Sequence, residues 1–528
     1  LTPQLEGSLA GGSDAWRRLL LSGSDTWGGN GVRADLNVTH SGGYRDDMAY
    51  DRVSGTVRWD AYLPANATLR TTATYSAIDQ TDGSTVPTSD YQSGSPVNYN
   101  PISFRRVNAF RLVSAFERPF SAGVLSLTPY VRHNTMEILP SWMLSYDPVV
   151  YTSGHNSAGL LAKLRYDLPF WEAKVIGGVD LEYSPGFREE NVIAVTKTGA
   201  MYGSYTEGAR IYDYDVAFRG ASPYLQADLT PLARLGVSLG VRYDHVGYDY
   251  DTHLEPLATG RWRRPADTQV RYDHLSPKLG ATYELGRALN LFGSYRHGFR
   301  APSEGQLFRQ GSSINGPDLK PVRADSWEAG ARGSAGPLSY EASAYRMDVR
   351  DDILTYQVPA GTGFNRVNVN AGHTRHAGVE LALGVELFAG LRLDGSYSNA
   401  VQRYLEWTPS TTESYDGKRI ESAPRVLANT RLSWTPRFAP DARVGAEWVR
   451  VGSYFLDPAN THTYPGHDLF NLRLNVPVTR TVELDGRITN LFDTRYADSA
   501  TYDRFLGEQF MPGAPRSLNL AVQYRWQR

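Results

Sequence analysis

The stretch Pro515–Trp526 reads Pro-Arg-Ser-Leu-Asn-Leu-Ala-Val-Gln-Tyr-Arg-Trp and decides the fold. Its apolar residues alternate with polar or small ones, and the apolar set is Leu518, Leu520, Val522, Tyr524 and Trp526. A period of two places the two sets on opposite faces of a β-strand. One such strand fits a soluble sandwich. The same pattern along a whole chain indicates a barrel that is apolar outside and polar inside.

The alternation recurs from one end of the chain to the other. Val53–Asp60 sets valines and a tryptophan against serine, threonine and charged residues, and Leu235–Asp244 sets leucine, valine and tyrosine against glycine, serine, arginine and aspartate. Further examples are Leu69–Ala77, Arg287–Tyr295, Leu391–Tyr397, Val444–Trp448 and Leu469–Val476. No stretch keeps a helical period over about 12 residues. We therefore predict an all-β chain.

The composition is compatible with a transmembrane barrel. The 528 residues include 33 Tyr against 18 Phe, and tyrosine suits a membrane interface because its ring is apolar and its hydroxyl is polar. Mean hydropathy is −0.41, and no stretch approaches the roughly 20 apolar residues of a transmembrane helix, but polar inner residues lower the average of any membrane barrel. The absence of cysteine excludes disulfides and Cys-ligated metals, and the net charge of −2 does not point to nucleic acid.

Short and long connections alternate between the predicted strands. The short, turn-like segments are Gly23–Gly31, Leu63–Asn66, Arg118–Ala122, Asp167–Trp171, Thr230–Arg234, Leu285–Ala288, Ser334–Pro337, Phe388–Gly390, Pro436–Asp441 and Val478–Arg480. The longest polar connections are Asp79–Arg105, Met136–Asn156, Pro185–Asp215, Tyr250–Thr268, Arg300–Pro321 and Asn490–Ala514.

Short turns at one rim and long loops at the other are typical of outer-membrane barrels, with the turns periplasmic and the loops extracellular. Ten turns separate eleven loop-connected hairpins when both chain ends lie on the turn side, so we predict about 22 antiparallel strands. We predict one domain over residues 1–528, closed by pairing of Pro515–Trp526 with Leu5–Gly12.

Several stretches resemble the β-barrel of TonB-dependent outer-membrane receptors. In order they are Ser294–Pro302, Pro317–Pro321, Ala371–Glu380 and Arg487–Asp498, followed by the closing strand. The resemblance covers nearly the whole chain. It implies that the protein spans the outer membrane of a Gram-negative cell and contacts its lipids. It also implies TonB-driven uptake of a scarce nutrient, most often a ferric siderophore. Family members also carry an N-terminal plug and a TonB box. This sequence has neither, so we expect it to be the barrel part of a longer receptor whose plug contacts TonB.

Ligand-binding residues are expected in the long loops, because a flat anionic ferric chelate needs aromatic faces, phenol donors and forked guanidinium donors. Tyr202, Tyr205, Tyr212 and Tyr214 crowd the predicted loop Pro185–Asp215, where a membrane-interface belt or loop filler is the alternative. The candidate ligand-binding residues are Trp142, Tyr146, Arg188, Tyr202, Tyr205, Arg210, Gln306 and Arg309.

Two further groups of residues invite an interpretation. The apolar run Met136–Tyr146 lies in a predicted loop. We expect it to be buried there, either against a plug or a ligand or against other loops. Four polar residues occupy the inner positions of predicted strands and are expected to line the lumen and face the plug: Arg58, Arg70, Arg242 and Asp244.

Other functions have weaker support in the sequence. Phe299–Pro302 and Pro317–Leu319 resemble the paired boxes of haem receptors, but no His lies in Ser303–Gly316 to bind iron. His133, Met136 and Met143 are the best soft-metal candidates. We expect no resident cofactor or metal and, without a catalytic motif, no enzyme. The alternatives left open are a passive porin-like channel, a receptor for haem or another nutrient, and an outer-membrane enzyme or adhesin.

Overall fold

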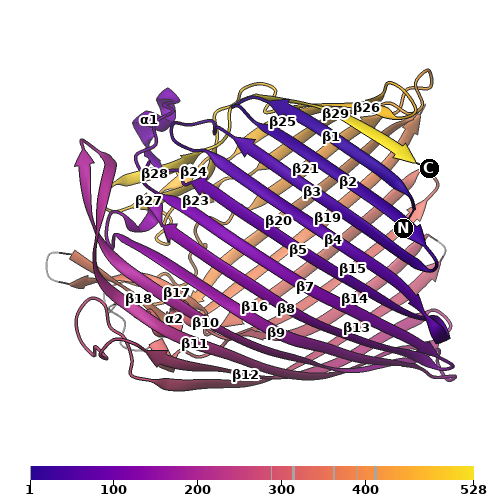
Figure 1. Ribbon diagram of the computed structural model, residues 1–528, viewed down its shortest axis with the longest axis horizontal. Helices are drawn as coiled ribbons and strands as arrows, with labels where there is room; N and C mark the ends of the chain where they lie inside the picture. Colours follow the sequence, from indigo (N-terminus) through magenta and orange to yellow (C-terminus); the bar gives the residue numbers. More distant parts are fainter. Residues whose placement is uncertain are drawn as a thin grey trace.

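A computed structural model describes residues 2–286, 288–311, 316–360, 363–370, 372–388, 390–409 and 413–527. Several positions used in the sequence analysis lie outside the described residues: Arg287 and Ala389 in two predicted turns, 312–315 in the predicted loop Arg300–Pro321, and Ala371 in one of the family-like stretches. The described strands include a single 22-stranded antiparallel sheet that closes on itself (Figure 1). The predicted fold class and strand number are confirmed.

The barrel strands follow one another around the wall in chain order. They are β1 (Gln4–Gly12), β2 (Arg17–Trp27), β3 (Asn30–Ser41), β4 (Tyr50–Leu63), β5 (Ala67–Thr81), β7 (Phe104–Phe120), β8 (Gly123–Leu139), β9 (Val149–Asp167), β10 (Lys174–Thr198), β11 (Met201–Leu232), β12 (Leu235–Thr252), β13 (Thr268–Gly286), β14 (Leu289–Arg300), β15 (Val322–Ala335), β16 (Leu338–Arg350), β19 (His373–Phe388), β20 (Leu391–Glu406), β21 (Val426–Trp434), β22 (Arg443–Val451), β25 (His467–Pro477), β26 (Val482–Thr489) and β29 (Ser517–Gln527).

Smaller elements lie in the connections. The short strands are β6 (Val86–Pro87), β17 (Ile353–Ala360), β18 (Gly363–Asn370), β23 (Tyr454–Phe455), β24 (Thr463–Tyr464), β27 (Ala497–Asp503) and β28 (Gly507–Pro512). The helical turns are α1 (Thr88–Ser93), α2 (Glu304–Phe308), η1 (Pro64–Asn66), η2 (Ser141–Met143) and η3 (Gly316–Asp318). No helix in the described part of the chain is long and apolar enough to cross a membrane.

The first and last strands close the barrel. β1 pairs antiparallel with β29, so that Leu5 lies opposite Trp526 and Gly12 lies opposite Asn519, as the sequence predicted. Both chain ends lie at the end of the barrel that carries the short turns (Figure 1). Each of the ten predicted turns overlaps a connection between consecutive barrel strands at this end, although only Gly28 and Gly29 of the predicted turn Gly23–Gly31 lie outside β2 and β3. Closure leaves the sheet without an edge strand.

Two of the predicted loops are wrong in extent. β8 continues to Leu139 and β9 begins at Val149, so Met136–Asn156 contains only a nine-residue loop, 140–148. Pro185–Asp215 is strand rather than loop, because β10 runs to Thr198 and β11 begins at Met201. These strands extend beyond the membrane zone, where the outer face no longer contacts lipid. The apolar alternation that reveals a membrane strand is therefore lost there.

The outward face carries an apolar band between two rows of aromatic residues. Leu9, Leu239 and Leu520 are exposed members of this band. The row near the turns includes Trp27, Trp59, Tyr166, Tyr283, Trp434, Tyr524 and Trp526, and the row near the loops includes Tyr75, Phe110, Tyr183, Tyr243, Trp327, Tyr397 and Phe470. Aromatic rows at both rims are the interfacial girdles of a transmembrane barrel.

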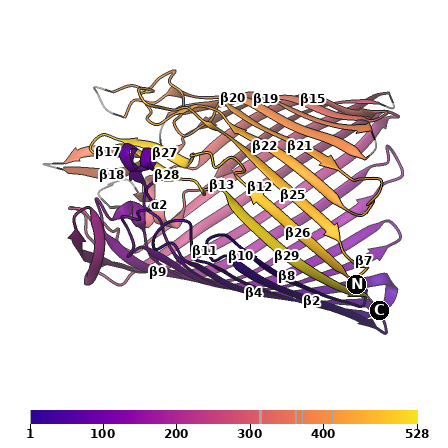
Figure 2. The same cartoon turned by 90° about the horizontal axis from the view of Figure 1, so that it is seen from above.

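At the loop end the connections fold into packed bodies that occupy the mouth (Figure 2). The larger core includes Met143, Tyr212, Tyr250 and Phe308. A second core joins β23–β24 to β27–β28 and includes Tyr454, Tyr464 and Phe510, with Tyr91 of α1 packed against it. The loops are therefore an ordered part of the fold.

We expect the closing seam to be sensitive to side-chain volume at Gly12. A Cβ there would lie 2.6 Å from the carbonyl oxygen of Leu518 and would also meet the Asn519 amide, whereas a Cβ at Gly7 would lie 3.6 Å from Leu21. Gly12→Ala should lower the free energy of unfolding by about 1–3 kcal/mol, and Gly7→Ala on the same strand should have little effect. Urea unfolding in lipid vesicles measures both, and equal losses would contradict the close approach.

Candidate functional site

The loop after β14 is anchored in the mouth by α2. Ser303 and Gln306 form a capping box at the start of α2, in which each side chain bonds the other residue's backbone N–H. Leu307 and Phe308 are fully buried, and the ring of Phe308 stacks on Tyr250 at 4.4 Å. The Phe299–Pro302 box is thus the end of a strand that leads into a fixed loop.

A buried ionic network begins where this loop meets β10. The side chain of Glu190 has no exposed surface and accepts hydrogen bonds from Arg188 (Nη2, 2.6 Å) and Arg309 (Nη2, 2.6 Å; Nε, 2.9 Å). The guanidinium of Arg188 also lies 3.8 Å from the ring centre of Tyr151. Because an unpaired buried carboxylate is very costly, Glu190 holds the two arginines in place.

The network continues into the loop 140–148 through Asp147. Arg309 donates from its Nη2 atom to Asp147 at 2.8 Å, and Arg261 forms an ion pair with the same carboxylate at 3.1 Å. The indole N–H of Trp262 donates to Asp147 at 3.1 Å. Strand β10 and three separate loops are therefore fixed to one another by alternating charges.

The environment changes the pKa values of the network in the directions that keep it ionised. Burial alone would raise the pKa of Glu190, but Arg188 and Arg309 outweigh it and hold that pKa below its usual value. Burial likewise opposes the lowered pKa of Asp147, which Arg309 maintains. The neighbouring Tyr214 is instead kept neutral, because burial and Glu304 raise its pKa. We call Arg188, Glu190, Arg309 and Asp147 the clamp. Its carboxylates stay ionised and its guanidinium groups stay protonated, which suits anchoring rather than acid–base chemistry.

Three of the eight candidate ligand-binding residues meet in or beside this network. Arg188 and Arg309 share Glu190, and the backbone carbonyl of Tyr146 accepts a hydrogen bond from Arg261. Gln306 acts instead as the capping residue of α2. The two arginines have their guanidinium groups occupied by carboxylates.

The other candidates are dispersed. Tyr202 and Tyr205 pack in a third core with Leu139 and Leu144, and Lys197 lies over the ring of Tyr202. Arg210 pairs with Glu189 and Asp213, both at 2.9 Å. Trp142 is 57% exposed. Tyr202 and Tyr205 therefore pack between a loop and the strands in this structure, and a contact with ligand stays a prediction.

The apolar run Met136–Tyr146 also serves packing between loops. Met143 belongs to the larger core, and Leu139 and Leu144 belong to the third. The soft-metal candidates are divided, since His133 and Met136 are three residues apart on β8 and so point to opposite faces, and Met143 lies in the larger core. Among the described residues no group of three His, Cys, Asp or Glu could hold a metal.

The sequence analysis missed the carboxylates that organise the site. Glu190 and Asp147 look like ordinary loop acids in the sequence, and their burial depends on contacts with residues more than a hundred positions away. One local signal was available. Arg188 and Glu190 are two residues apart, which places both on the same face of a strand.

The four predicted lumen residues form ion pairs along the inner wall. Asp60 pairs with Arg58 at 2.5 Å and Arg70 at 3.0 Å, and Arg242 pairs with Asp180 at 2.5 Å and Asp244 at 2.8 Å. They lie on the strand faces opposite the exposed apolar residues, consistent with a polar lumen. Contact with a plug stays a prediction.

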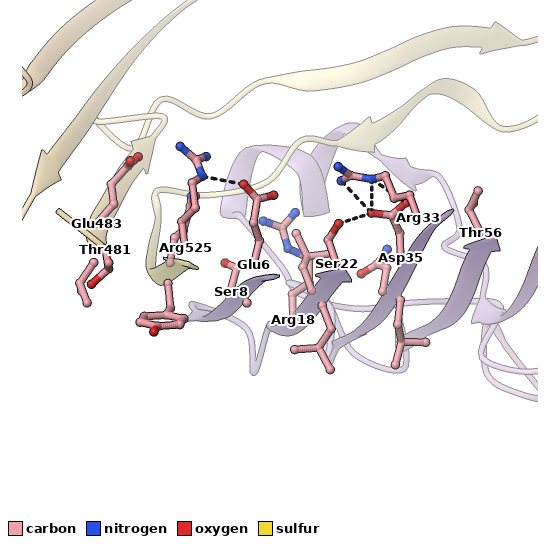
Figure 3. Close-up of a pocket in the computed structure, with 18 of the residues that line it drawn as sticks. Glu6, Ser8, Arg18, Ser22, Arg33, Asp35, Thr56, Thr481, Glu483 and Arg525 are labelled. Carbon is pink, nitrogen blue, oxygen red and sulfur yellow. Dashed lines mark hydrogen bonds and ion pairs between the residues drawn. The ribbon is translucent and has the colours of Figure 1, made fainter. Parts of the chain in front are cut away.

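A recess of about 360 Å³ in the wall near the closing seam has the same chemistry (Figure 3). Arg525 pairs with Glu6 at 2.6 Å, and Asp35 accepts from Arg33 at 2.8 Å and Ser22 at 2.5 Å. Figure 3 shows these side chains on one side of their strands. Each acid of these pairs is matched by an arginine, and Arg18, Arg480 and Glu483 also line the recess, so its wall is polar and carries both signs of charge.

A closed 22-stranded barrel with a polar lumen and a mouth built by folded loops defines a large transmembrane receptor or channel barrel. Residues 4–491 match the family model described as TonB dependent receptor-like, beta-barrel. The chain belongs to this family.

Relatives and solved structures agree with this assignment. The chain is 24% identical over 291 residues to the metal-pseudopaline receptor CntO of Pseudomonas aeruginosa, and 24% identical over 326 residues to the ferrioxamine B receptor of Salmonella typhimurium. These alignments cover 54% and 60% of this chain, but only 38% and 43% of the relatives.

The fold is similar to the ferric-catecholate import receptor Fiu of E. coli K12, with a TM-score of 0.79 and 16% identity over 99% of this chain and 82% of Fiu. The siderophore receptor PiuA of Acinetobacter baumannii gives a TM-score of 0.76 and 17% identity over 100% and 82%. At such identities these structures support the fold alone.

Removing the central carboxylate should release the loops. Glu190→Gln would leave two buried arginines short of a charge partner, which costs about 3–5 kcal/mol in comparable buried pairs. Hydrogen exchange should then rise in 301–311 and 140–148 but not in the membrane strands. Glu189→Gln is the matched control, because Glu189 is 46% exposed and its ion pair is worth at most about 1 kcal/mol. Equal exchange in the two variants would contradict the clamp.

The clamp should also fail in acid. The pKa values of Glu190 and Asp147 are lowered by folding, so their contribution is complete above the usual carboxyl pKa of about 4 and is lost as pH falls below it. Hydrogen exchange of 301–311 should be constant from pH 7 to about pH 5 and accelerate below about pH 4, after correction for intrinsic rates. A loss of protection already at about pH 6 would indicate control by histidine instead.

Proposed function

We propose that this chain is the barrel of an outer-membrane receptor that takes up a ferric siderophore or a similar metal chelate by a TonB-dependent mechanism. The observation that carries the proposal is the family match over residues 4–491. Two similar proteins, the metal-pseudopaline and ferrioxamine B receptors, are named for metal chelates, which supports this ligand class. The transported chelate is substrate and not a resident cofactor.

The mouth offers suitable chemistry for such a ligand. Trp142 and the partly exposed guanidinium groups of Arg210 and Arg261 lie on loop-end segments. Aromatic faces and forked donors bind flat anionic chelates. Arg188 and Arg309 support this surface from below, because the buried Glu190 fixes the loops that carry it. We propose that they position the mouth rather than contact the ligand.

The lumen needs an internal partner for gated uptake. A 22-stranded barrel encloses a wide lumen, which in outer-membrane transporters is closed by a plug. We propose that a plug domain sits against the charged wall that includes Arg58, Arg70, Arg242 and Asp244, and that it transmits the TonB signal. The ion pairs of this wall favour a polar, hydrated interface over an apolar one.

Binding of ferric chelates tests the proposed substrate class. Ferric hydroxamate, catecholate and citrate-type chelates are titrated against the receptor in detergent, with tryptophan fluorescence as the readout. At least one should bind saturably at micromolar or lower concentration, and its metal-free form should bind more weakly. The double variant Arg210→Gln, Arg261→Gln should weaken binding at least tenfold without unfolding the barrel, because charged hydrogen bonds contribute about 1.5–3 kcal/mol each.

Two results would argue against the proposal. One is the absence of binding to every chelate in the panel. The other is a large steady conductance of the complete receptor in planar bilayers together with unselective passage of small solutes, which would favour the passive channel.

A further inference from the structure

The outward face of the barrel carries an arginine-rich surface at the loop end of β15 and β16. Val322 and Val349 belong to the larger core inside the mouth. Successive side chains of a strand point to opposite faces, so Arg323, Asp348 and Arg350 point outward. The inner core therefore fixes the direction of these charged residues independently of any assumption about the membrane.

The next two strands continue this surface. Thr374 on β19 and Tyr404 on β20 are buried, with 1% and 2% exposure. Their neighbours His373, Arg375 and Arg403 consequently lie on the outward face. We call Arg323, Arg346, Arg350, His373, Arg375 and Arg403 the outer arginine patch.

Like charges face one another across the strands of the patch. Arg323 is directly opposite Arg350, Arg350 is opposite His373, and Arg375 is opposite Arg403. Directly opposed like charges destabilise a sheet unless a counter-charge lies between them. The arrangement therefore requires anions.

The carboxylates nearby satisfy only part of the patch. Asp348 accepts both Arg346 (2.7 Å) and Arg375 (2.6 Å), and Asp351 pairs with Arg323 at 2.5 Å. Asp325, opposite Asp348, is engaged by His297 at 2.7 Å and by Tyr295 at 2.9 Å. Glu406, at the outer edge, is the cross-strand neighbour of His373.

Two guanidinium groups of the outer arginine patch have no carboxylate within hydrogen-bond distance in the described part of the chain. Arg350 forms no hydrogen bond or close ion pair with any residue that the structure describes, although its charge acts on Asp325 from a greater distance, and Arg403 reaches only the carbonyl oxygen of Gly417 at 3.4 Å. The two residues lie on strands two apart in the sheet, and their partners on the intervening strand are two residues apart, so their Cα atoms are about 12 Å from each other. Arg375 and His373 lie on the strand between them.

The patch lies at the height of lipid headgroups. Trp327 is a 45% exposed member of the aromatic girdle and lies directly opposite Arg346. The ring centres of Trp327 and Tyr295 are 5.5 Å apart. Arg350 is two outward positions further toward the loop end than Arg346. Aromatic girdles mark the boundary between acyl chains and headgroups, so Arg350 and Arg403 lie on the polar side of that boundary.

We propose that the outer arginine patch binds a phosphate of a lipid headgroup in the outer leaflet, with Arg350 and Arg403 as the principal donors. Forked guanidinium groups suit phosphate oxygens, and the girdle below the patch suits acyl chains. An acidic protein could neutralise the arginines of the patch, but it would not contact the aromatic girdle below them, which faces the lipid. The inference rests on the membrane location proposed above and is independent of the identity of the chelate.

Lipid binding to the purified, folded protein tests the inference. Native mass spectrometry in detergent gives the affinity for bisphosphorylated lipid A and for the same lipid after phosphatase treatment. The wild type should retain the phosphorylated form preferentially. Arg350→Gln with Arg403→Gln should weaken its binding by about 25-fold, from roughly fivefold for each arginine near a membrane surface.

Arg106→Gln is the matched control, because Arg106 also points outward at the loop end but is already paired with Asp79 and Glu137. It should leave lipid A binding within about twofold of wild type. A similar loss in the control would overturn the inference, as would equal retention of the dephosphorylated lipid.

A free anion is distinguished from a headgroup by competition. Inorganic phosphate at millimolar concentration should not displace the lipid, and displacement would overturn the assignment to a headgroup. Titration with the chelates described above separates this inference from the proposed function. The double variant should bind chelate like the wild type. Failure of the wild type to bind any chelate, with normal binding of the lipid, would count against the proposed function alone.

Discussion

The pairing of β1 with β29 is the interaction on which the rest of the structure depends. Within a bilayer there is no water to satisfy backbone N–H and C=O groups, so a sheet must close or leave an edge of unpaired groups in lipid. Closure between Leu5 and Trp526 removes that edge and fixes the strand tilt, the lumen and the two rims. Every later feature, from girdles to loops, is placed relative to this cylinder.

Charged side chains are paired differently on the three surfaces of the barrel: the lumen, the mouth and the outward face. In the lumen, arginines and acids pair along the wall, as Arg58 and Asp60 do. In the mouth, the buried Glu190 joins two arginines and fixes the loops. On the outward face near Arg350, arginines exceed the acids able to pair with them. The desolvation cost of an unpaired charge explains the first two arrangements, and access to headgroups permits the third.

Much of the barrel could be predicted from the sequence because membrane strands impose a strict local rule. The ten turns and the partnership of the terminal strands follow from alternation and turn residues that lie within a few positions of each other. The rule failed for Pro185–Asp215, where β10 and β11 extend beyond the lipid and their outer residues are no longer required to be apolar. For the site, Arg188 and Arg309 were singled out from the sequence, but the buried Glu190 that joins them was not.

The sequence by itself therefore determined the fold class, the number of strands, the closing pair and the family, since each is written in periodicity or in short motifs. Only the tertiary structure decided which charges are buried together, how α2 seats in the mouth, and which face of β16 carries the unpaired Arg350. These features join residues such as Asp147 and Arg309, far apart in the chain. Their energies come from burial and mutual distance, which no local pattern in the sequence encodes.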